Sequence, residues 1–381
     1  MGDVCEVTMG QSPDGSTYSD EPSDYILVQG NADLKDGWVV PRVWTSQKTK
    51  TAQAGDLIMS VRAPVGAMGK TAYDIVIGRG VATIKGNEFI YQTLVKYDAD
   101  GYWKKLAAGS TFESVNSNEV KGAIINVPQD IEEQKKIGEY FLNLDHLITL
   151  HQQKITRLIK LKKAMLEKMF PKKGSVIPEF RFNGFANAWE QRKLGDIADV
   201  TKLAGFEFTE HVVYSDEGNI IALRGLNIKN GQLILDDVKY IDGSNFSKLS
   251  RSKLFINDIM FTYVGTVGEV AIIKENDRFY LAPNVSRIRV KSDDSPKFIS
   301  HYMRTDNFKN KVIFPLIATS SQPALSMENI RKFTINIPIN REEQDYLAKY
   351  FDSLDHLINL HQRKLDMLKK LKSACLSEMF I

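Results

Sequence analysis

The chain has 381 residues, of which 43% are hydrophobic and 25% are charged, with a formal net charge of +3. This length and composition predict a globular protein of two or three domains and exclude a disordered or fibrous chain. No apolar run has transmembrane length and the first residues do not have the order of a signal peptide, so we expect a cytoplasmic protein that does not enter a membrane.

Residues 1–130 have the pattern of an α/β domain rich in strands. Residues 25–29, 56–62 and 81–84 are apolar, β-prone runs bounded by glycines. Residues 103–108 are predicted to form a short helix. We therefore expect the first globular domain to end at residue 130.

One stretch of this domain is similar to a phosphate-binding loop. Residues 64–71 (PVGAMGKT) end in Gly-Lys-Thr, but the leading glycine that such a loop needs is replaced by Pro64. The corresponding stretch of the second half, residues 264–270 (VGTVGEV), has no lysine. These glycines are interpreted as turn formers, and no nucleotide site is expected.

Residues 131–170 are predicted to form one long amphipathic helix. Asp130 can act as its N-cap, and Glu133 stands at the third helical position, which is a capping-box arrangement. Apolar residues then recur at spacings of three and four. Forty residues at about 1.5 Å each give a rod of about 60 Å, a length typical of a coiled coil.

Residues 171–340 are predicted to hold a connector, rich in Pro and Gly, and a second globular domain. Short segments of this domain correspond to segments of the first: IALRG at 221–225 corresponds to ILVQG at 26–30, and TSSQPAL at 319–325 corresponds to GSTFESV at 109–115. WEQRKL precedes the second Gly-Asp, at Gly195, whereas the first half starts at once with Met-Gly-Asp. The pattern therefore anticipates a short segment before Gly2.

Residues 341–381 repeat the long helix at an offset of 210 positions, with 22 of 40 aligned residues identical. Asn340 and Glu343 repeat the start signal. We expect the two helices to pair antiparallel, which brings His151 and His361 close together. Two histidines supply too few ligands for a metal, so they are interpreted as polar positions that fix register, and no metal site is expected. The predicted helix-pairing seam comprises Leu144, Ile148, His151, Ile155, Leu158, Leu354, Ile358, His361, Leu365 and Leu368.

The predicted fold class is α+β: two α/β domains separated by a long antiparallel two-helix coiled coil, with a pseudo-two-fold internal repeat. Such a rod suits a target that is itself two-part, and duplex DNA offers equivalent groove faces every turn of about 34 Å. Because the two globular domains differ in sequence, the two half-sites should differ as well.

Catalytic motifs are missing from the sequence. There is no adenosylmethionine loop with the Asn/Asp-Pro-Pro-aromatic tetrapeptide of an amino-methyltransferase, and no convincing Ser/His/Asp or Cys/His constellation. We therefore predict a non-catalytic chain with no catalytic residues.

The repeated helix with EEQ, LDHLI, LHQ and the closing MF, together with the connector PEFRFNGFANAWEQRKLGDI, resembles the repeated regions of type I restriction-modification specificity subunits. The resemblance covers essentially the whole chain. It implies two target recognition domains that each read one half of a split, asymmetric DNA site, and repeated helices that set the spacing and dock two methyltransferase subunits.

The resemblance also implies where the cofactors belong. S-adenosylmethionine would be bound by the methyltransferase subunits, which methylate adenine, and ATP and Mg by restriction or motor subunits, with no cofactor on this chain. The main alternative is a protein-interaction scaffold built on the paired helices. A self-sufficient nuclease or methyltransferase would require the catalytic motifs that are missing.

Candidate DNA contacts are Lys and Arg, which suit phosphates, and Arg, Asn, Gln, Ser or Thr on loops, which suit base edges. For the first domain the predicted residues are Gln29, Lys48, Lys50, Arg62, Lys70, Ser110 and Thr111. For the second domain they are Arg224, Lys229, Tyr263, Thr266, Arg287, Ser320, Ser321 and Gln322.

Overall fold

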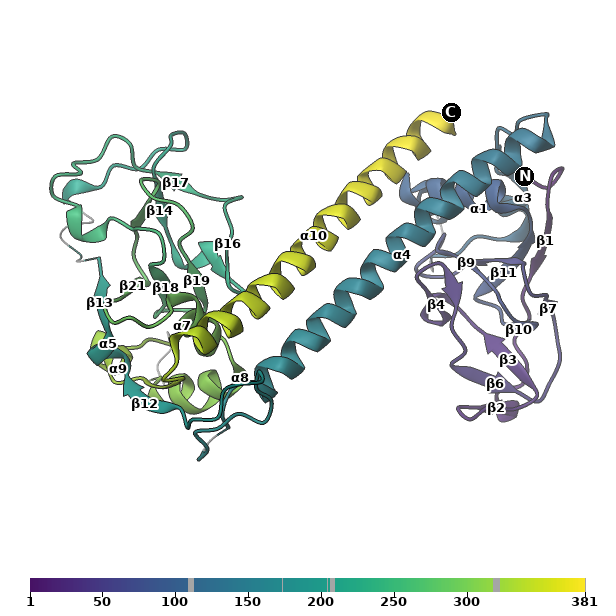
Figure 1. The fold of residues 1–381 in the computed structure, drawn as a ribbon. Coiled ribbons are helices and arrows are strands. Elements are labelled where there is room, and N and C mark those ends of the chain that lie inside the picture. The colour runs from purple at the N-terminus through teal and green to yellow at the C-terminus, as the bar shows by residue number, and fades with distance from the viewer. Residues whose placement is uncertain (109–112, 173, 204, 206–209, 318–322, 381) are drawn as a thin grey trace. The chain divides into compact units, whose positions relative to one another are not determined.

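The computed structural model of the chain describes residues 1–108, 113–172, 174–203, 205, 210–317 and 323–380. Two compact units are present: Met1–Ile155 together with Leu360–Ile381, and Thr156–Asn359. The two long helices are each divided between the units, because each half packs against the core of a different globular domain. Figure 1 labels the helices and strands along the chain.

The main sheet of the first unit has the strand order β1-β11-β8-β9-β5-β4. Its first four strands pair antiparallel, whereas β5 pairs parallel with β9. The strands are β1 (Glu6–Met9), β4 (Leu34–Lys35), β5 (Trp38–Val39), β8 (Leu57–Ser60), β9 (Met68–Lys70) and β11 (Val81–Lys85).

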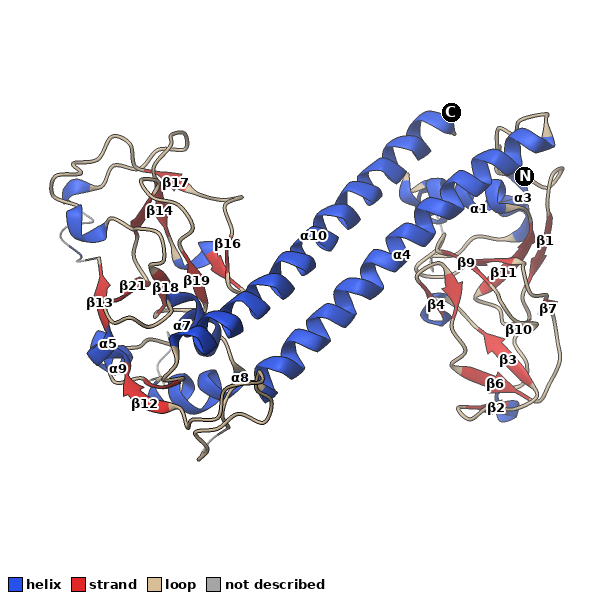
Figure 2. Cartoon of the chain, in the orientation of Figure 1, coloured by secondary structure: helices blue, strands red, loops and turns tan. Residues whose placement is uncertain are grey.

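A second sheet of this unit has the order β2-β6-β3-β10-β7, and its β3 and β10 run parallel. Its strands are β2 (Tyr18–Ser19), β3 (Tyr25–Val28), β6 (Val43–Thr45), β7 (Thr51–Ala52) and β10 (Ile75–Ile77). The strands predicted from residues 25–29, 56–62 and 81–84 are confirmed as β3, β8 and β11. Figure 2 shows both sheets in red.

The second unit repeats this plan. Its four-stranded sheet has the order β13-β21-β18-β19, the counterpart of β1-β11-β8-β9, and β14 runs parallel with β20 as β3 does with β10. The strands of this unit are β12 (Glu190–Lys193), β13 (Ala198–Lys202), β14 (Ile221–Leu223), β15 (Ile228–Lys229), β16 (Gln232–Leu233), β17 (Lys239–Tyr240), β18 (Ile259–Thr262), β19 (Val270–Ile272), β20 (Phe279–Leu281), β21 (Val285–Val290) and β22 (Thr334–Ile337).

Short helices connect the strands, and two long helices dominate the chain. The α-helices are α1 (Glu88–Ala99), α2 (Tyr102–Ala107), α3 (Ser117–Gly122), α4 (Ile131–Lys168), α5 (Leu194–Ile197), α7 (Pro296–Met303), α8 (Asp306–Phe308), α9 (Met327–Arg331) and α10 (Arg341–Met379). Single turns of 3-10 helix are η1 (Gly15–Thr17), η2 (Asn31–Asp33), η3 (Gly225–Asn227), η4 (Ser250–Ser252) and η6 (Phe314–Leu316), and η5 (Lys309–Ile313) is a π-helical turn. Among the described residues, no helix combines the length and the apolar character needed to cross a bilayer.

The phenylalanine that closes each repeat completes a hydrophobic core. In the first unit, the ring of Phe380 lies 4.9 Å from that of Phe89 and 5.5 Å from that of Phe141. In the second unit, Phe170 lies 5.5 Å from Phe351, the counterpart of Phe141. Burying a ring of this size contributes about 2 to 3 kcal/mol, which explains why the sequence repeats this residue.

The starts of the long helices agree only in part with the sequence prediction. The predicted N-caps are confirmed: Asp130 accepts from the N–H of Glu132 at 2.9 Å, and Asn340 from that of Glu342 at 2.8 Å. The capping box predicted for Glu343 is wrong, because its two carboxylate oxygens instead accept hydrogen bonds from side chains of the connector.

The two long helices contact each other within each unit through repeated charged residues. In the first unit, Lys372 of α10 donates to Asp145 of α4 at 2.6 Å. In the second unit, Lys162 of α4 pairs with Asp355 of α10. The first half of each helix therefore contacts the second half of the other, and the aspartate of the repeated LDH motif forms the ion pair in both units.

Candidate nucleic-acid interface

Each globular domain carries a tight turn between two antiparallel strands, β8 and β9 in the first domain and β18 and β19 in the second. In the first domain the N–H of Gly66 donates to the carbonyl of Ser60 at 2.9 Å, and in the second the N–H of Gly268 donates to the carbonyl of Thr262 at 3.0 Å. The two glycines have φ values of 100° and 95°, a region that favours glycine. The glycine near the end of each turn therefore has the same left-handed φ and the same hydrogen bond, as expected for turn-forming glycines.

A later segment of the chain lies against each turn. The N–H of Ala63 donates to the carbonyl of Glu113 at 3.1 Å, and the N–H of Gly265 donates to that of Pro323 at 2.9 Å. Five predicted contacts stand just before these segments and lie outside the described residues: Ser110, Thr111, Ser320, Ser321 and Gln322.

The loop that follows β10 in the first domain, or β20 in the second, also lies beside the turn and is hydrogen-bonded to the residue that follows β8 or β18. The N–H of Val61 donates to the carbonyl of Gly80 at 2.9 Å, and the N–H of Tyr263 donates to that of Asn284 at 3.1 Å. A Cβ on Gly80 would lie 2.0 Å from the carbonyl oxygen of Gln29, so this close approach requires glycine. The loop is thereby fixed beside the residue that follows β3.

These backbone contacts define two equivalent surfaces, which we call the loop faces. The first loop face comprises residues 29–30, 62–66, 78–80 and 113–114, and the second comprises residues 224–225, 264–268, 282–284 and 323–324. At matching positions of the two halves the side chains differ: Gln29 aligns with Arg224, Arg62 with Val264, and Arg79 with Pro283. One backbone arrangement thus carries two different sets of side chains.

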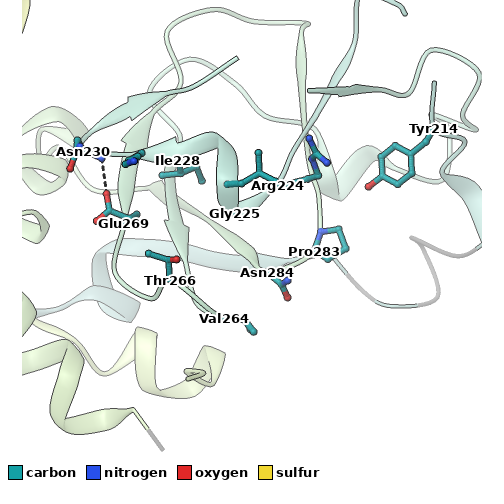
Figure 3. Close-up of a pocket in the computed structure, with 12 residues that line it drawn as sticks. Tyr214, Arg224, Gly225, Ile228, Asn230, Val264, Thr266, Glu269, Pro283 and Asn284 are labelled. Carbon is teal, nitrogen blue, oxygen red and sulfur yellow. Dashed lines mark hydrogen bonds between the residues drawn. The ribbon is translucent and has the colours of Figure 1, made fainter. Parts of the chain in front are cut away.

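A cavity of about 750 Å³ opens beside the second loop face (Figure 3). It brings together three residues that the sequence predicted as DNA contacts, namely Arg224, Lys229 and Thr266. The other lining residues are Tyr214, Gly225, Leu226, Ile228, Asn230, Val264, Glu269, Pro283 and Asn284. In Figure 3, Arg224 and Tyr214 lie toward one end, and Asn230, whose N–H donates to Glu269 at 2.7 Å, lies toward the other.

Arg224 is held by a pair that a ligand can replace. Its Nη2 donates to both the carbonyl and the carboxylate of Asp237 at 2.9 Å, and its Nε is buried without a hydrogen-bond partner among the described residues. The carboxylate of Asp237 is 71% exposed, so this pair contributes less than about 1 kcal/mol. A phosphate or a guanine edge can therefore replace it at small cost. Partial burial raises the pKa of the adjacent Tyr214, whose hydroxyl is protonated near neutral pH as in any tyrosine and can donate.

Two other predicted contacts point into the protein. Lys70 is paired with Glu88 at 2.8 Å, and its ammonium lies 4.5 Å from the ring centre of Tyr91. Arg287 is buried on β21 and paired with Asp199 at 2.8 Å. For either cation to reach DNA, these ion pairs would have to open.

The remaining predicted residues lie near the surface. Arg62 is exposed on the first loop face, and Gln29 is half-buried there. Lys48 and Lys50 are exposed in the loop before β7, with the ammonium of Lys48 5.9 Å from the ring of Tyr25. In the second unit, Tyr263 is half-buried next to its turn.

Sequence reasoning missed two cations of this interface. Arg79 is exposed between two glycines on the first loop face, and the Gly-Arg-Gly sequence was a signal that could have revealed it. Lys202 ends β13 with its ammonium 5.7 Å from the ring of Tyr263. No local pattern marked Lys202, because its position depends on the pairing of β13 with β21.

The seam residues of the long helices lie largely inside. Leu144, Ile155, Leu158, Leu354 and Leu365 are buried, and Ile148, Ile358 and Leu368 are half-buried. The two histidines expected to come close lie in the first unit with their Nδ1 atoms 2.9 Å apart. Burial and the neighbouring His151 lower the pKa of His361, so His361 favours its neutral form, which can share a hydrogen bond with His151.

A family model for the type I restriction modification DNA specificity domain matches residues 1–160 and 187–370. The chain belongs to this family, and the family predicted from the repeated helix is thereby confirmed. Two relatives come from Methanocaldococcus jannaschii. The putative type I restriction enzyme MjaX specificity subunit is 29% identical over 169 residues, which is 42% of this chain and 39% of that protein. The type I restriction enzyme MjaVIII specificity subunit is 23% identical over 286 residues, 73% of this chain and 66% of that protein.

The matched stretches cover less than two thirds of either relative. Both are named specificity subunits, which agrees with the prediction of a non-catalytic chain. The fold is similar to that in the crystal structure of a type I restriction-modification system S subunit from M. genitalium, with a TM-score of 0.68 and 13% identity over 100% of this chain and 94% of that one.

Proposed function

We propose that this chain is the DNA sequence-specificity subunit of a type I restriction-modification complex, and that it recognises a bipartite, asymmetric site on double-stranded DNA. In this proposal each loop face reads one half of the site. The observation that carries it is the pair of loop faces, in which the same backbone hydrogen bonds support different side chains. A conserved backbone with exchanged side chains suits two half-sites that differ in sequence.

The chemistry of the loop faces supports DNA as the ligand. Arg62 and Arg79 are exposed on the first, and Arg224 and Lys229 line the cavity beside the second. Arginine binds the O6 and N7 atoms of guanine with two hydrogen bonds, and it also pairs with phosphate. The mild net charge of +3 agrees with cations gathered on particular surfaces rather than spread over the chain.

The long helices would act as an antiparallel coiled coil that fixes the gap between the half-sites, with pseudo-two-fold symmetry. They are continuous over 38 and 39 residues, which is a length of about 57 Å each. The ion pairs of Asp145 with Lys372 and of Asp355 with Lys162 support this pairing.

Exposed leucines on these helices would dock two methyltransferase subunits. They recur at matching positions of the repeat, with exposures of 42% and 39% for Leu147 and Leu357 and of 46% and 38% for Leu150 and Leu360. Large apolar side chains that recur at an exposed position indicate a surface that a partner covers. In the assembled complex, S-adenosylmethionine would belong to these partners, and ATP and Mg to the motor subunits.

Mapping methylated adenine across the genome, in cells with and without this gene, tests the proposal. Deletion should abolish methylation of one split, asymmetric motif. Exchange of residues 195–340 for the same region of another family member should change one half of that motif and leave the other. An unchanged map in cells that contain the partner methyltransferase would contradict the proposal.

A protein-interaction scaffold remains the alternative, and salt separates the two functions. A protein that binds several phosphates loses affinity steeply as salt rises, because the free energy gained by releasing counterions from the DNA becomes smaller. Binding of target DNA by the purified complex should therefore weaken by orders of magnitude between about 50 and 200 mM salt. Absence of DNA binding at low salt would favour the scaffold.

A further inference from the structure

The second globular domain carries a small hairpin that borders two cavities. Strands β15 and β16 pair antiparallel and are joined by Asn230 and Gly231, whose φ values of 53° and 84° are those of an Asn-Gly hairpin turn. Lys229 and Asn230 line the cavity beside the second loop face. They also line a second cavity of about 580 Å³, together with Ile159 of α4 and Ile358 of α10. The position of the hairpin therefore sets the shape of both cavities.

Two groups of contacts hold the turn of this hairpin. The first comes from the globular domain, where the N–H of Asn230 donates to Glu269 at 2.7 Å. The second comes from Arg304, the residue that follows α7. Its Nη2 donates to the carbonyl of Asn230 at 3.1 Å, and its Nη1 donates to a carboxylate oxygen of Asp355 on α10 at 3.0 Å. One guanidinium thus connects the hairpin turn to a long helix.

The side chain of Arg304 is enclosed and has little freedom to move. It is 11% exposed, and its Nη1 also lies 3.3 Å from Nδ1 of His301. A Cβ on Gly231 would lie 2.1 Å from the central carbon of the guanidinium, so this close packing requires glycine. Asp355 is also paired with Lys162 of α4. Arg304 is therefore fixed to an ion pair between the two long helices, and the turn is fixed to Arg304.

The equivalent hairpin of the first unit, β4–β5, is held by different chemistry. A Cβ on Gly37, at its turn, would lie 2.7 Å from the hydroxyl of Tyr91 on α1. The ring of Trp38 lies 5.2 Å from the ammonium of Lys70, which is paired with Glu88 of α1. Aromatic side chains thus contact this hairpin where a guanidinium does so in the second unit. A change at Arg304 should therefore act on the second half alone.

We infer that Arg304 is a positioning residue for the second loop face: it holds the hairpin turn on the ion pair of the long helices, and so keeps Lys229 in place to bind a phosphate of the DNA backbone. This inference rests on the proposed function, because Lys229 belongs to the same interface. Lys229 is exposed, and a lysine ammonium binds phosphate as a point charge. Arg304 is enclosed by protein groups, so it acts through Lys229 and makes no DNA contact of its own.

A double-mutant cycle tests this role with the unchanged chain, Lys229→Ala, Arg304→Met and the double variant. Methionine keeps an apolar stem and removes the donors, while Asp355 keeps Lys162 as its counter-charge. Each chain, in complex with its methyltransferase subunits, is titrated with target duplex at several salt concentrations. Lys229→Ala should raise Kd about tenfold and lower the slope of log Kd against log salt by about 0.9, because one phosphate contact is lost.

Arg304→Met should reproduce both effects. The double variant should bind no more weakly than Arg304→Met alone, because Lys229 is already displaced in that chain. A merely structural role of Arg304 gives a different result: a smaller folded fraction raises the apparent Kd alike at every salt concentration and leaves the slope unchanged. An unchanged slope for Arg304→Met, or additive effects in the double variant, would overturn the inference.

Arg278→Met is the matched control for the loss of an arginine from this domain. The ion pair of Arg278 with Glu275 is about half exposed on both sides, and Arg278 lines neither cavity, so Kd should change less than about twofold.

Arg224→Ala separates failure of this inference from failure of the proposed function. If Arg224→Ala weakens binding and Lys229→Ala does not, the second loop face binds DNA and the role of Arg304 is overturned. If neither variant weakens binding, and Arg62→Ala does not either, the proposed function fails and the inference fails with it.

Discussion

Replacing Arg62 by alanine should weaken DNA binding without unfolding the first domain. The side chain is exposed, whereas its backbone is held by the antiparallel bridge to Ser114 and by the hydroxyl of Ser60, which donates to the carbonyl of Arg62 at 3.0 Å. Alanine keeps both backbone contacts. The free energy of unfolding should therefore change by less than about 0.5 kcal/mol.

The size of the binding loss depends on what Arg62 contacts. A base contact with two hydrogen bonds is worth about 1 to 3 kcal/mol, which is about a five- to 150-fold increase in Kd for the target and little change for non-specific DNA. A phosphate contact would instead weaken all sequences alike and lower the slope of log Kd against log salt by about 0.9. Titration of target and scrambled duplexes at several salt concentrations, with the chain in complex with its methyltransferase, distinguishes the two.

Lys85→Ala is the matched control for this experiment. Lys85 ends β11, the strand that begins next to the first loop face, and its ammonium pairs with Glu6 on the surface at 3.3 Å. Replacing it removes one positive charge from the same domain at a position distant from the loops. Binding should be nearly unchanged. If Arg62→Ala bound as the unchanged chain does at physiological salt, or if Lys85→Ala lost as much affinity, the loop face would not be the interface.

Three other predictions follow from the structure. Glu343→Gln should lower the free energy of unfolding, measured by denaturant titration, by about 3 kcal/mol, because the largely buried guanidinium of Arg181 loses its counter-charge. An unchanged midpoint would refute the role of this pair. The lowered pKa of His361 means that folding favours its neutral form, so its contribution to stability is complete above the ordinary pKa of 6.5 and is lost as pH falls below it. His361→Asn should therefore flatten the dependence of the free energy of unfolding on pH between about pH 7 and 5. An unaltered slope would exclude His361 as its source. Leu357→Lys should reduce co-purification of the methyltransferase subunit while the chain keeps its unfolding midpoint, and full recovery of the complex would exclude this surface.

The local elements of this protein were predictable because short-range patterns specify them. The spacing of apolar residues at three and four positions predicted the long helices, and Asp130 and Asn340 accept the hydrogen bonds expected of N-caps. Apolar, β-prone runs bounded by glycine predicted β3, β8 and β11. In each case the residues that decide the structure are neighbours in sequence.

The direction of the charged side chains was not predictable. Lys70 and Arg287 were expected among the DNA contacts, yet their partners Glu88 and Asp199 lie 18 and 88 positions away and pair with them only in the folded domain. Glu343 suggested a capping box from its spacing alone. Its actual partner, Arg181, is 162 positions away.

The sequence by itself determined the family, the duplication and the long helices, because a repeat of 22 identical residues in 40 and a helical period are properties of the chain that need no partner. Only the tertiary structure decided which residues form the loop faces. The pairing of β8 with β9 and β11, and of β3 with β10, brings together four segments that are separated by up to 85 positions, from Gln29 to Ser114. It also decided that the buried carboxylate of Glu343 pairs with Arg181 of the connector, because this contact depends on the segment that lies across the helix and not on the helix itself.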